Sequence, residues 1–174
     1  MQKGVVRKRR TSQLSEYGKQ LQEKQELKNQ YNLRERQFRH YIENALEKSG
    51  AQNAEEQLLQ HLERRLDNVV FRMGVAETRK QARQLVSHGH IRVNEKRVLV
   101  PSYQTKRGDK ISVRPNSQEN VFFKNRKLAL KKYESPSWLE LHKENLEAEI
   151  KGAPGPEEIG VTVQIPLVFE FYSR

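Results

Sequence analysis

The strongest constraint on the fold is a change of apolar period at Gly89. Before it, apolar residues recur at helical spacing, and after it Ile91 and Val93 alternate with Arg92. A helical period buries one stripe of a helix, whereas an alternating period buries one face of a strand. Glycine adopts the positive φ that ends many helices without a steric cost. The sequence therefore predicts a helix that ends at about His88 and a strand that follows directly.

Start and stop signals divide the chain before Gly89, which forms the corner between helix and strand, into helices. Ser, Thr, Asn and Asp side chains accept hydrogen bonds from the first N–H groups of a helix, and a Glu or Gln three residues later can reciprocate. The predicted starts are Ser15, Asn32 with Glu35, Asn53 with Glu56, and Thr78 with Gln81. The predicted stops are Ser49-Gly50 and Gly74, with Asp67 capping a break between them. The last two helices are expected to be joined by a tight turn, as helix, tight turn and helix.

After the corner, turn residues separate short segments of alternating period. Asn94-Glu95 is predicted to join the first strand to a second strand at 98–100. A further turn at 107–109 is predicted to precede a strand at 111–113. The strands at 91–93 and 111–113 have apolar residues on one side only, which is typical of strands that are half-buried in an antiparallel sheet.

The remaining chain predicts one more helix and an extended end. The helix is expected at 124–132, and GAPGP at 152–156 is the clearest loop. The final VTVQIPLVFEFYSR is predicted to be extended, with Pro166 excluding a central strand position there. The expected fold class is α+β, with a helical N-terminal domain, two short helices and a small antiparallel sheet. The expected division is a basic disordered arm at 1–13, a helical domain at 14–62, a second domain at 63–125 and a C-terminal segment closing the fold at 126–174.

The charge of the chain points to a polyanionic partner. The 174 residues carry a net charge of +11, and 32% of them are charged. A basic balance of this size favours nucleic acid or an anionic membrane as the partner. The charge is uneven, with +8 over residues 61–114 and −5 over residues 133–174. We therefore expect the acidic end to pack on the protein itself or to face a basic protein.

Other features of the composition exclude several classes of protein. No apolar run approaches the ~20 residues that span a bilayer, and the N-terminus lacks the apolar core of a signal peptide. The protein is therefore expected to be intracellular and soluble. Because the chain has no cysteine, it cannot form a disulfide, a thiolate nucleophile or a cysteine-ligated metal site.

Four separated blocks of sequence resemble the bacterial small-subunit ribosomal protein of the S-four family. They are SEYGKQLQEKQELKNQYNLRERQF, LERRLDNVVFRMGVAETRKQARQLVSHGHIRVN, PSWLEL and FEFYSR, in the order and approximate spacing of the family. Residues 63–114 also resemble the S-four RNA-binding domain of some tRNA synthetases, pseudouridine synthases and a ribosome-associated heat-shock protein. Two departures are a shortened N-terminal extension and Asn94-Glu95, where the family commonly has Asn-Gly.

The resemblance implies a structural constituent of the small ribosomal subunit that binds its rRNA at a multi-helix junction. Such a protein nucleates assembly of the subunit body, and its contact with the neighbouring S-five protein affects decoding accuracy. The resemblance also implies a place near the mRNA entry region of the cytoplasmic ribosome. It implies no enzymatic reaction, cofactor, metal, membrane partner or small-molecule substrate. Some relatives also repress their own mRNA.

The basic residues are the candidates for contact with RNA, which is recognised mostly through its shape, phosphates and 2′-hydroxyls. Arg79 and Arg83 share one face of the helix after Thr78, whose first turn also attracts phosphate. The alternative is that these arginines are merely solvated. The predicted RNA-binding residues are Lys3, Arg7, Lys8, Arg9, Arg10, Lys19, Arg34, Arg36, Arg39, Arg64, Arg65, Arg72, Thr78, Arg79, Lys80, Arg83, His88, Lys96, Arg97, Lys106 and Arg107.

Three alternatives compete with this interpretation. Pseudouridine synthases use an aspartate in a tripeptide similar to RLD at 65–67, so Asp67 could belong to an rRNA-modifying enzyme, although the chain has no room for the separate catalytic domain. The protein could also be a free S-four-domain stress factor that binds RNA. His88 and His90 lack a third nearby ligand and form a poor zinc site. Separately, Tyr31, Phe38 and Tyr41 could stack on bases, although their spacing is more typical of a core.

Overall fold

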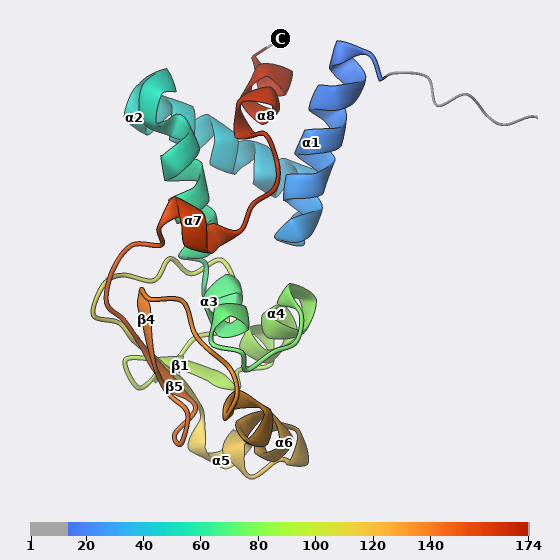
Figure 1. The fold of residues 1–174 in the computed structure, drawn as a ribbon. Coiled ribbons are helices and arrows are strands. Elements are labelled where there is room, and N and C mark those ends of the chain that lie inside the picture. The colour runs from blue at the N-terminus through green and yellow to red at the C-terminus, as the bar shows by residue number, and fades with distance from the viewer. Residues whose placement is uncertain (1–13, 174) are drawn as a thin grey trace, which may run out of the picture.

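The computed structural model of the chain describes residues 14–173, except for the side chains at 49–52 and 156. The predicted basic arm at 1–13 lies outside the described residues. Figure 1 shows a helical half, which contains both the first and the last helix, above a half that contains the sheet. The fold is α+β, as predicted. Residues 64–66 connect α2 in the helical half to α3 in the other half. No helix among residues 14–173 is long and apolar enough to cross a membrane.

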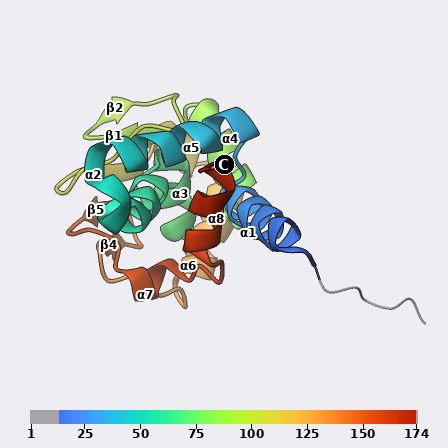
Figure 2. The ribbon, with the colours of Figure 1, turned by 90° about the horizontal axis from the view of Figure 1, so that it is seen from above.

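Helices α1, α2 and α8 make the core of the helical half. Their bounds are Glu16–Gln30 for α1, Glu35–Glu63 for α2 and Ile165–Tyr172 for α8. Figure 2 shows α8 lying between α1 and α2. The side chains of Leu27, Phe38, Leu58 and Val168 are fully buried in this core. Core packing of this kind is the reason why a helix of modest intrinsic propensity stays helical.

The predicted start of α1 is confirmed, and the predicted start of α2 is wrong. Ser15 caps α1 by accepting a hydrogen bond from the Gly18 N–H at 3.2 Å. Asn32 does not cap α2, which begins at Glu35. Asn32 has a φ of 52°, and its N–H donates to the Asn29 carbonyl at 2.9 Å. The residue therefore ends α1, in the left-handed conformation that asparagine tolerates better than most residues.

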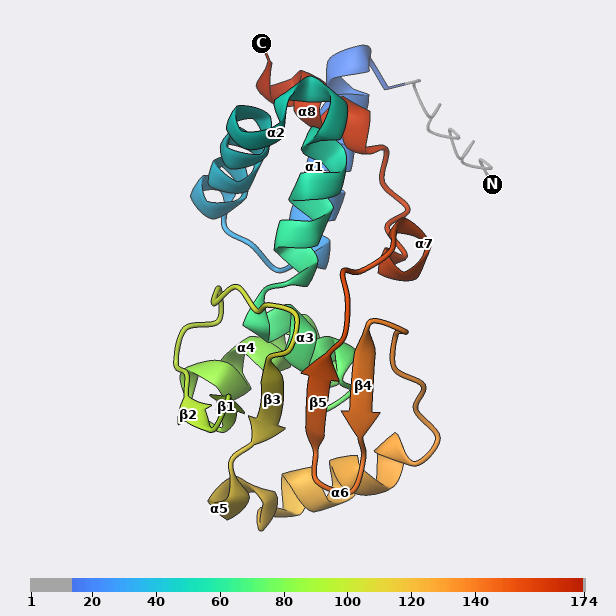
Figure 3. The same ribbon diagram turned by 90° about the vertical axis from the view of Figure 1, so that its left-hand side faces the viewer.

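Helix α2 also continues through the predicted stop at Ser49-Gly50 and the predicted start at Asn53. Figure 3 shows that this 29-residue helix is bent, so that its two halves run in different directions. Ser and Gly pairs are a common cause of sharp helix bends, and Ser49-Gly50 lies at the middle of α2. The signal in the sequence therefore marks a bend of the helix and not its end.

Helices α3 (Leu66–Arg72) and α4 (Arg79–Ser87) form the predicted helix, tight turn and helix. The hydroxyl of Thr78 accepts a hydrogen bond from the Gln81 N–H at 3.1 Å, which confirms the predicted cap. Gly74 ends α3 with a φ of 72°, and Gly89 follows α4 with a φ of 75°. The break before α3 is confirmed, but Asp67 lies in its first turn and not at its N-cap position.

The sheet has five antiparallel strands in the order β2-β1-β3-β5-β4. The strands are β1 (Ile91–Val93), β2 (Lys96–Arg97), β3 (Lys110–Val113), β4 (Leu139–His142) and β5 (Glu147–Ile150). Asn94 and Glu95 both have positive φ, of 47° and 66°, as a two-residue hairpin turn requires. This tight turn places Lys96 opposite Val93, so the return strand predicted at 98–100 lies too late in the chain.

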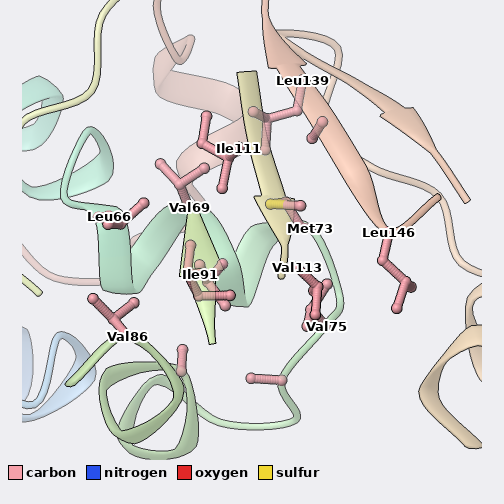
Figure 4. Packing of buried hydrophobic residues seen from close by; sticks show 14 of the residues in the cluster. Leu66, Val69, Met73, Val75, Val86, Ile91, Ile111, Val113, Leu139 and Leu146 are labelled. Atoms are coloured by element: carbon pink, nitrogen blue, oxygen red, sulfur yellow. The ribbon is translucent and has the colours of Figure 1, made fainter. Parts of the chain in front are cut away.

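The second core lies between the sheet and helices α3 and α4. Figure 4 shows Leu66 and Val69 of α3, and Met73 directly after it, packed against Ile91 and Ile111 of the strands, and all five are fully buried. Helix α6 (Val121–Leu130) follows the short α5 (Pro115–Gln118) and starts before the predicted 124–132. The helices before Gly89 and the strands after it therefore share one core.

The C-terminal segment contributes to both halves. Strands β4 and β5 complete the sheet, and α7 (Pro156–Ile159) and α8 then pack on the helical half. The prediction of an extended end is wrong, because Pro166 lies in the first turn of α8, where proline needs no N–H partner. The acidic end packs on the protein, as expected. For example, Glu170 accepts a hydrogen bond from Gln20 at 2.9 Å.

Candidate nucleic-acid interface

A basic groove lies between the first half of α2 and the half that contains the sheet. Its volume is about 810 Å³. The residues that line it are Arg34, Arg36, Gln37, Arg39, His40, Glu43, Arg65, Arg83, Pro101 and Ser102. Figure 3 shows the loop between β2 and β3 running beneath this part of α2. The groove therefore brings together five of the arginines that the sequence predicts to bind RNA.

The periodicity of α2 explains why its cations face the groove. Phe38 and Ile42 are fully buried and fix one side of the helix to the core. Arg36 and His40, which are four residues apart, are exposed on another side. Among the described residues, Arg36 has no acidic partner, and Arg39 pairs only with Glu43, at 2.8 Å. The guanidinium groups at this end of α2 are therefore available to an anion.

Asp67 organises the floor of the groove. One of its carboxylate oxygens lies 2.7 Å from Nη2 of Arg65 and 3.0 Å from Nη2 of Arg83. Arg65 also donates to the hydroxyl of Tyr41 at 2.7 Å, and Arg83 donates to the carbonyl of Asn32. Burial alone would lower the pKa of Arg65, but hydrogen bonds and charge from Asp67 raise it above its usual value. Asp67 therefore holds both arginines in fixed positions.

Glu63 forms a second buried centre next to Asp67. Its carboxylate accepts hydrogen bonds from Tyr31 at 2.6 Å, Asn68 at 2.9 Å and Arg72 at 3.0 Å. Arg79 lies 3.8 Å from the same carboxylate and stacks over the ring of Tyr31 at 4.6 Å. Burial and the charge of Glu63 raise the pKa of Tyr31 well above its usual value. This centre connects the end of α1 to α2, α3 and α4.

Four of the predicted RNA-binding arginines therefore pair with a buried carboxylate. They are Arg65, Arg72, Arg79 and Arg83. The side chain of Arg65 is only 1% exposed, whereas that of Arg83 is 27% exposed. Buried charges must be paired, because an ion without a partner loses its hydration. The four arginines hold the two halves together, and of the four only Arg65 and Arg83 line the groove. Contact of these four arginines with RNA stays a prediction.

The remaining predicted residues are spread over the surface. The exposed ones are Lys19, Arg34, Arg36, Arg39, Thr78, Lys80, His88, Lys96, Arg97, Lys106 and Arg107, and Arg64 is half-buried. Lys3, Arg7, Lys8, Arg9 and Arg10 lie outside the described residues. Thr78, Arg79 and Lys80 line a second hollow of about 380 Å³ at the start of α4. Lys96 and Arg97 lie on β2, and Lys106 and Arg107 precede β3.

Sequence reasoning missed several residues of the groove. His40 follows Arg36 by four residues, and this helical spacing could have identified it. Pro101 and Ser102 carry no such signal, because a loop reaches the groove only through the tertiary fold. The carboxylates of Glu63 and Asp67 were also missed as partners of the arginines. Tyr31 and Phe38 are 2% and 0% exposed, so they belong to the core and do not stack on bases.

The geometry does not favour a catalytic or metal site. Asp67 is 3% exposed, and its two oxygens are occupied by Arg65, Arg83 and the Asn68 N–H. His90 Nδ1 lies 2.9 Å from the hydroxyl of Ser117, and burial lowers the pKa of His90. Within residues 14–173, no group of three His, Asp or Glu side chains is placed to hold a metal ion.

Comparison with known proteins places the chain in a family. Residues 1–63 match the model for the ribosomal protein S4/S9 N-terminal domain, and residues 64–111 match the S4 domain. Three similar relatives are each named small ribosomal subunit protein uS4. The one from Chloroflexus aurantiacus is 46% identical over 99% of this chain and 83% of its own length. The one from Roseiflexus castenholzii is 46% identical over 95% of this chain and 80% of its own length.

A third relative, from Thermoanaerobacter pseudethanolicus, is 48% identical over 92% of this chain and 76% of its own length. The two matched models meet between residues 63 and 64, where α2 leads into α3 and the basic groove lies. The similarity extends over nearly the whole chain and confirms the resemblance found in the four sequence blocks. The chain belongs to the uS4 family of small ribosomal subunit proteins.

Proposed function

We propose that this protein is a structural constituent of the small ribosomal subunit that binds its rRNA through the basic groove. The observation that carries the proposal is the gathering of Arg34, Arg36, Arg39, Arg65 and Arg83 around one groove between the two halves. Phosphate contacts supply much of the affinity of a protein for nucleic acid. The proposal is further supported by the net charge of +11 and by the names of the relatives.

The buried ion pairs give the groove a fixed shape. Both carboxylates lie near the connection between the halves. Glu63 of α2 pairs with Arg72 of α3 and Arg79 of α4, and Asp67 of α3 holds Arg83 of α4. RNA junctions are recognised largely by shape, so a binding protein must hold its cations at fixed spacings. Two rigidly joined halves with arginines between them can contact phosphates of separate RNA helices at the same time. This geometry supports binding at a multi-helix junction.

The finer parts of the proposal follow from the family resemblance. They are an early role in assembly of the subunit body, contact with the S-five protein that affects decoding accuracy, a place near the mRNA entry region and a location on cytoplasmic ribosomes. The function proposed here is structural and not enzymatic, and it is consistent with the internal role of Asp67. Recovery of one copy per purified small subunit would separate this function from that of a free stress factor.

Binding to small-subunit rRNA is expected to weaken steeply with salt. Each phosphate that the protein neutralises contributes roughly 0.7–0.9 to the slope of log affinity against log salt concentration. We expect a slope of several, measured by filter binding over a salt series, because several exposed cations line the groove. An unrelated duplex RNA of the same length is the control and should bind more weakly. Salt-insensitive binding, or equal affinity for both RNAs, would contradict the proposal.

A further inference from the structure

We propose that the loop at 99–103 holds one unpaired base of the bound RNA, with the ring of Tyr103 stacked on that base. The inference rests on the proposed function and names the class of RNA feature that the groove recognises. The loop lies between β2 and β3, and Figure 3 shows it passing between the helical half and the sheet. Its partner would be a nucleotide that has left its helix while its phosphate lies among the arginines.

The loop exposes an unusual amount of apolar surface next to a basic groove. Leu99 is 49% exposed, Val100 is 55% exposed and Tyr103 is 37% exposed. Pro101 and Ser102, which lie between them in sequence, line the groove together with the arginines. The exposed apolar residues therefore flank, along the chain, two residues that line the groove. Exposed apolar side chains that gather in one place, in contrast to scattered ones, mark an interaction site.

Hydrogen bonds fix this loop to the connection between the halves. The carbonyl of Tyr103 accepts from the Leu66 N–H at 2.9 Å, and the carbonyl of Pro101 accepts from the Asp67 N–H at 3.0 Å. The Thr105 N–H donates to the carbonyl of Arg64 at 2.9 Å. The loop thereby satisfies N–H groups that the first turn of α3 leaves free. Its apolar side chains are exposed on an ordered backbone, so binding would lose little conformational entropy.

The combination of charges and apolar groups identifies the partner. The arginines select an anion, and Tyr103 with Val100 selects a flat apolar face within reach of that anion. A paired RNA helix buries its base faces by stacking, whereas an unpaired nucleotide offers a base face and a phosphate together. Aromatic side chains commonly recognise single-stranded bases by stacking on them. An unpaired nucleotide at a junction therefore fits this surface better than a regular helix does.

Substitutions of Tyr103 test the inference. In filter binding to small-subunit rRNA, Tyr103→Ala is expected to bind about tenfold more weakly, within the range found when a stacking residue is replaced by alanine. Tyr103→Phe keeps the ring and is expected to bind like the wild type. Tyr17→Ala is the matched control, because Tyr17 is also exposed, at 51%, but lies on α1. The salt slope should be unchanged in all three variants, since no cation is removed.

A fluorescent base provides a direct readout of stacking. 2-Aminopurine placed at unpaired positions of the junction should be quenched by the wild type and by Tyr103→Phe, but not by Tyr103→Ala. Equal rRNA affinity of Tyr103→Ala and the wild type would overturn this inference and leave the proposed function standing. Loss of affinity in Tyr103→Phe would also overturn it, since the ring would then not be the binding group.

Two other outcomes separate this inference from its alternatives. If Tyr103→Ala binds rRNA normally but no longer binds a neighbouring ribosomal protein, the loop is a protein-docking surface and the inference is wrong. If the wild-type protein shows no salt-dependent binding to rRNA, the proposed function itself fails, and the inference fails with it. Circular dichroism of each variant at the assay temperature confirms that the compared proteins are folded.

Discussion

Asp67→Ala is expected to lower the free energy of unfolding by about 3–5 kcal/mol, the usual effect of removing one partner from a buried ion pair. The substitution leaves Arg65, with a side chain that is 1% exposed, without its acidic partner. It also releases Arg83, which joins α4 to the loop after α1 through the carbonyl of Asn32. Urea unfolding followed by circular dichroism measures the change. Binding of rRNA should weaken as well, because the floor of the groove loses its fixed arginines.

Glu43→Ala is the matched control for this prediction. Glu43 also pairs with an arginine at the groove, but the side chains of Arg39 and Glu43 are 66% and 50% exposed. Exposed pairs contribute about 0.2–1 kcal/mol, so this variant should unfold almost like the wild type. Asp67→Asn keeps the size of the side chain and should lie between the two. If Asp67→Ala is no less stable than Glu43→Ala, the buried pairs do not hold the two halves together.

Replacing Arg34, Arg36 and Arg39 together by alanine is expected to weaken rRNA binding roughly 100-fold at moderate salt, at about 1 kcal/mol or slightly less for each residue, the net contribution of a typical hydrogen bond. All three side chains are exposed, so the fold should be retained. The salt slope should fall by roughly 2–2.7, because each phosphate contact contributes about 0.7–0.9. Filter binding over the same salt series measures both quantities.

A second triple variant controls for net charge. Lys124, Lys131 and Lys132 are exposed at or directly after α6, which lies at the opposite end of the molecule from α2 in Figure 1. Their replacement by alanine removes the same charge from a different surface. It should change the affinity only slightly if the groove is the interface. Similar losses in the two triple variants would show that the total charge, and not the groove, controls binding.

Much of the fold could be predicted where a local signal has one structural meaning. Gly89 is such a case, since a glycine between a helical and an alternating period leaves few options. Asn32 is a contrasting case, because asparagine favours both the start of a helix and the left-handed residue after one. Asn32 is predicted to start a helix, whereas the structure uses it to end α1. Pro166 was misread for a similar reason, because it is compatible with both an edge strand and a first helical turn.

The site could be predicted only in part, for a different reason. The spacing of Arg79 and Arg83 correctly places them on one face of α4, but only tertiary packing decides what that face meets. It meets Asn68 and Asp67, so both arginines bind inside the protein. Arg36 faces solvent because Phe38, two residues later, fixes the opposite side of α2 in the core. A cation count finds the basic region, whereas the carboxylates determine which cations remain available.

The central claim is that rRNA lies in the groove between the two halves, and cleavage from a single introduced cysteine tests it directly. The chain has no cysteine, so Ser102→Cys adds a unique attachment point for an iron chelate at the groove. Ser137→Cys is the matched control, because it precedes β4, at the edge of the sheet farthest from β2. Hydroxyl radicals from Ser102→Cys should cut the rRNA at a compact set of junction nucleotides, and those from Ser137→Cys should leave these nucleotides intact. Cleavage of the junction from position 137 and not from position 102 would contradict the claim.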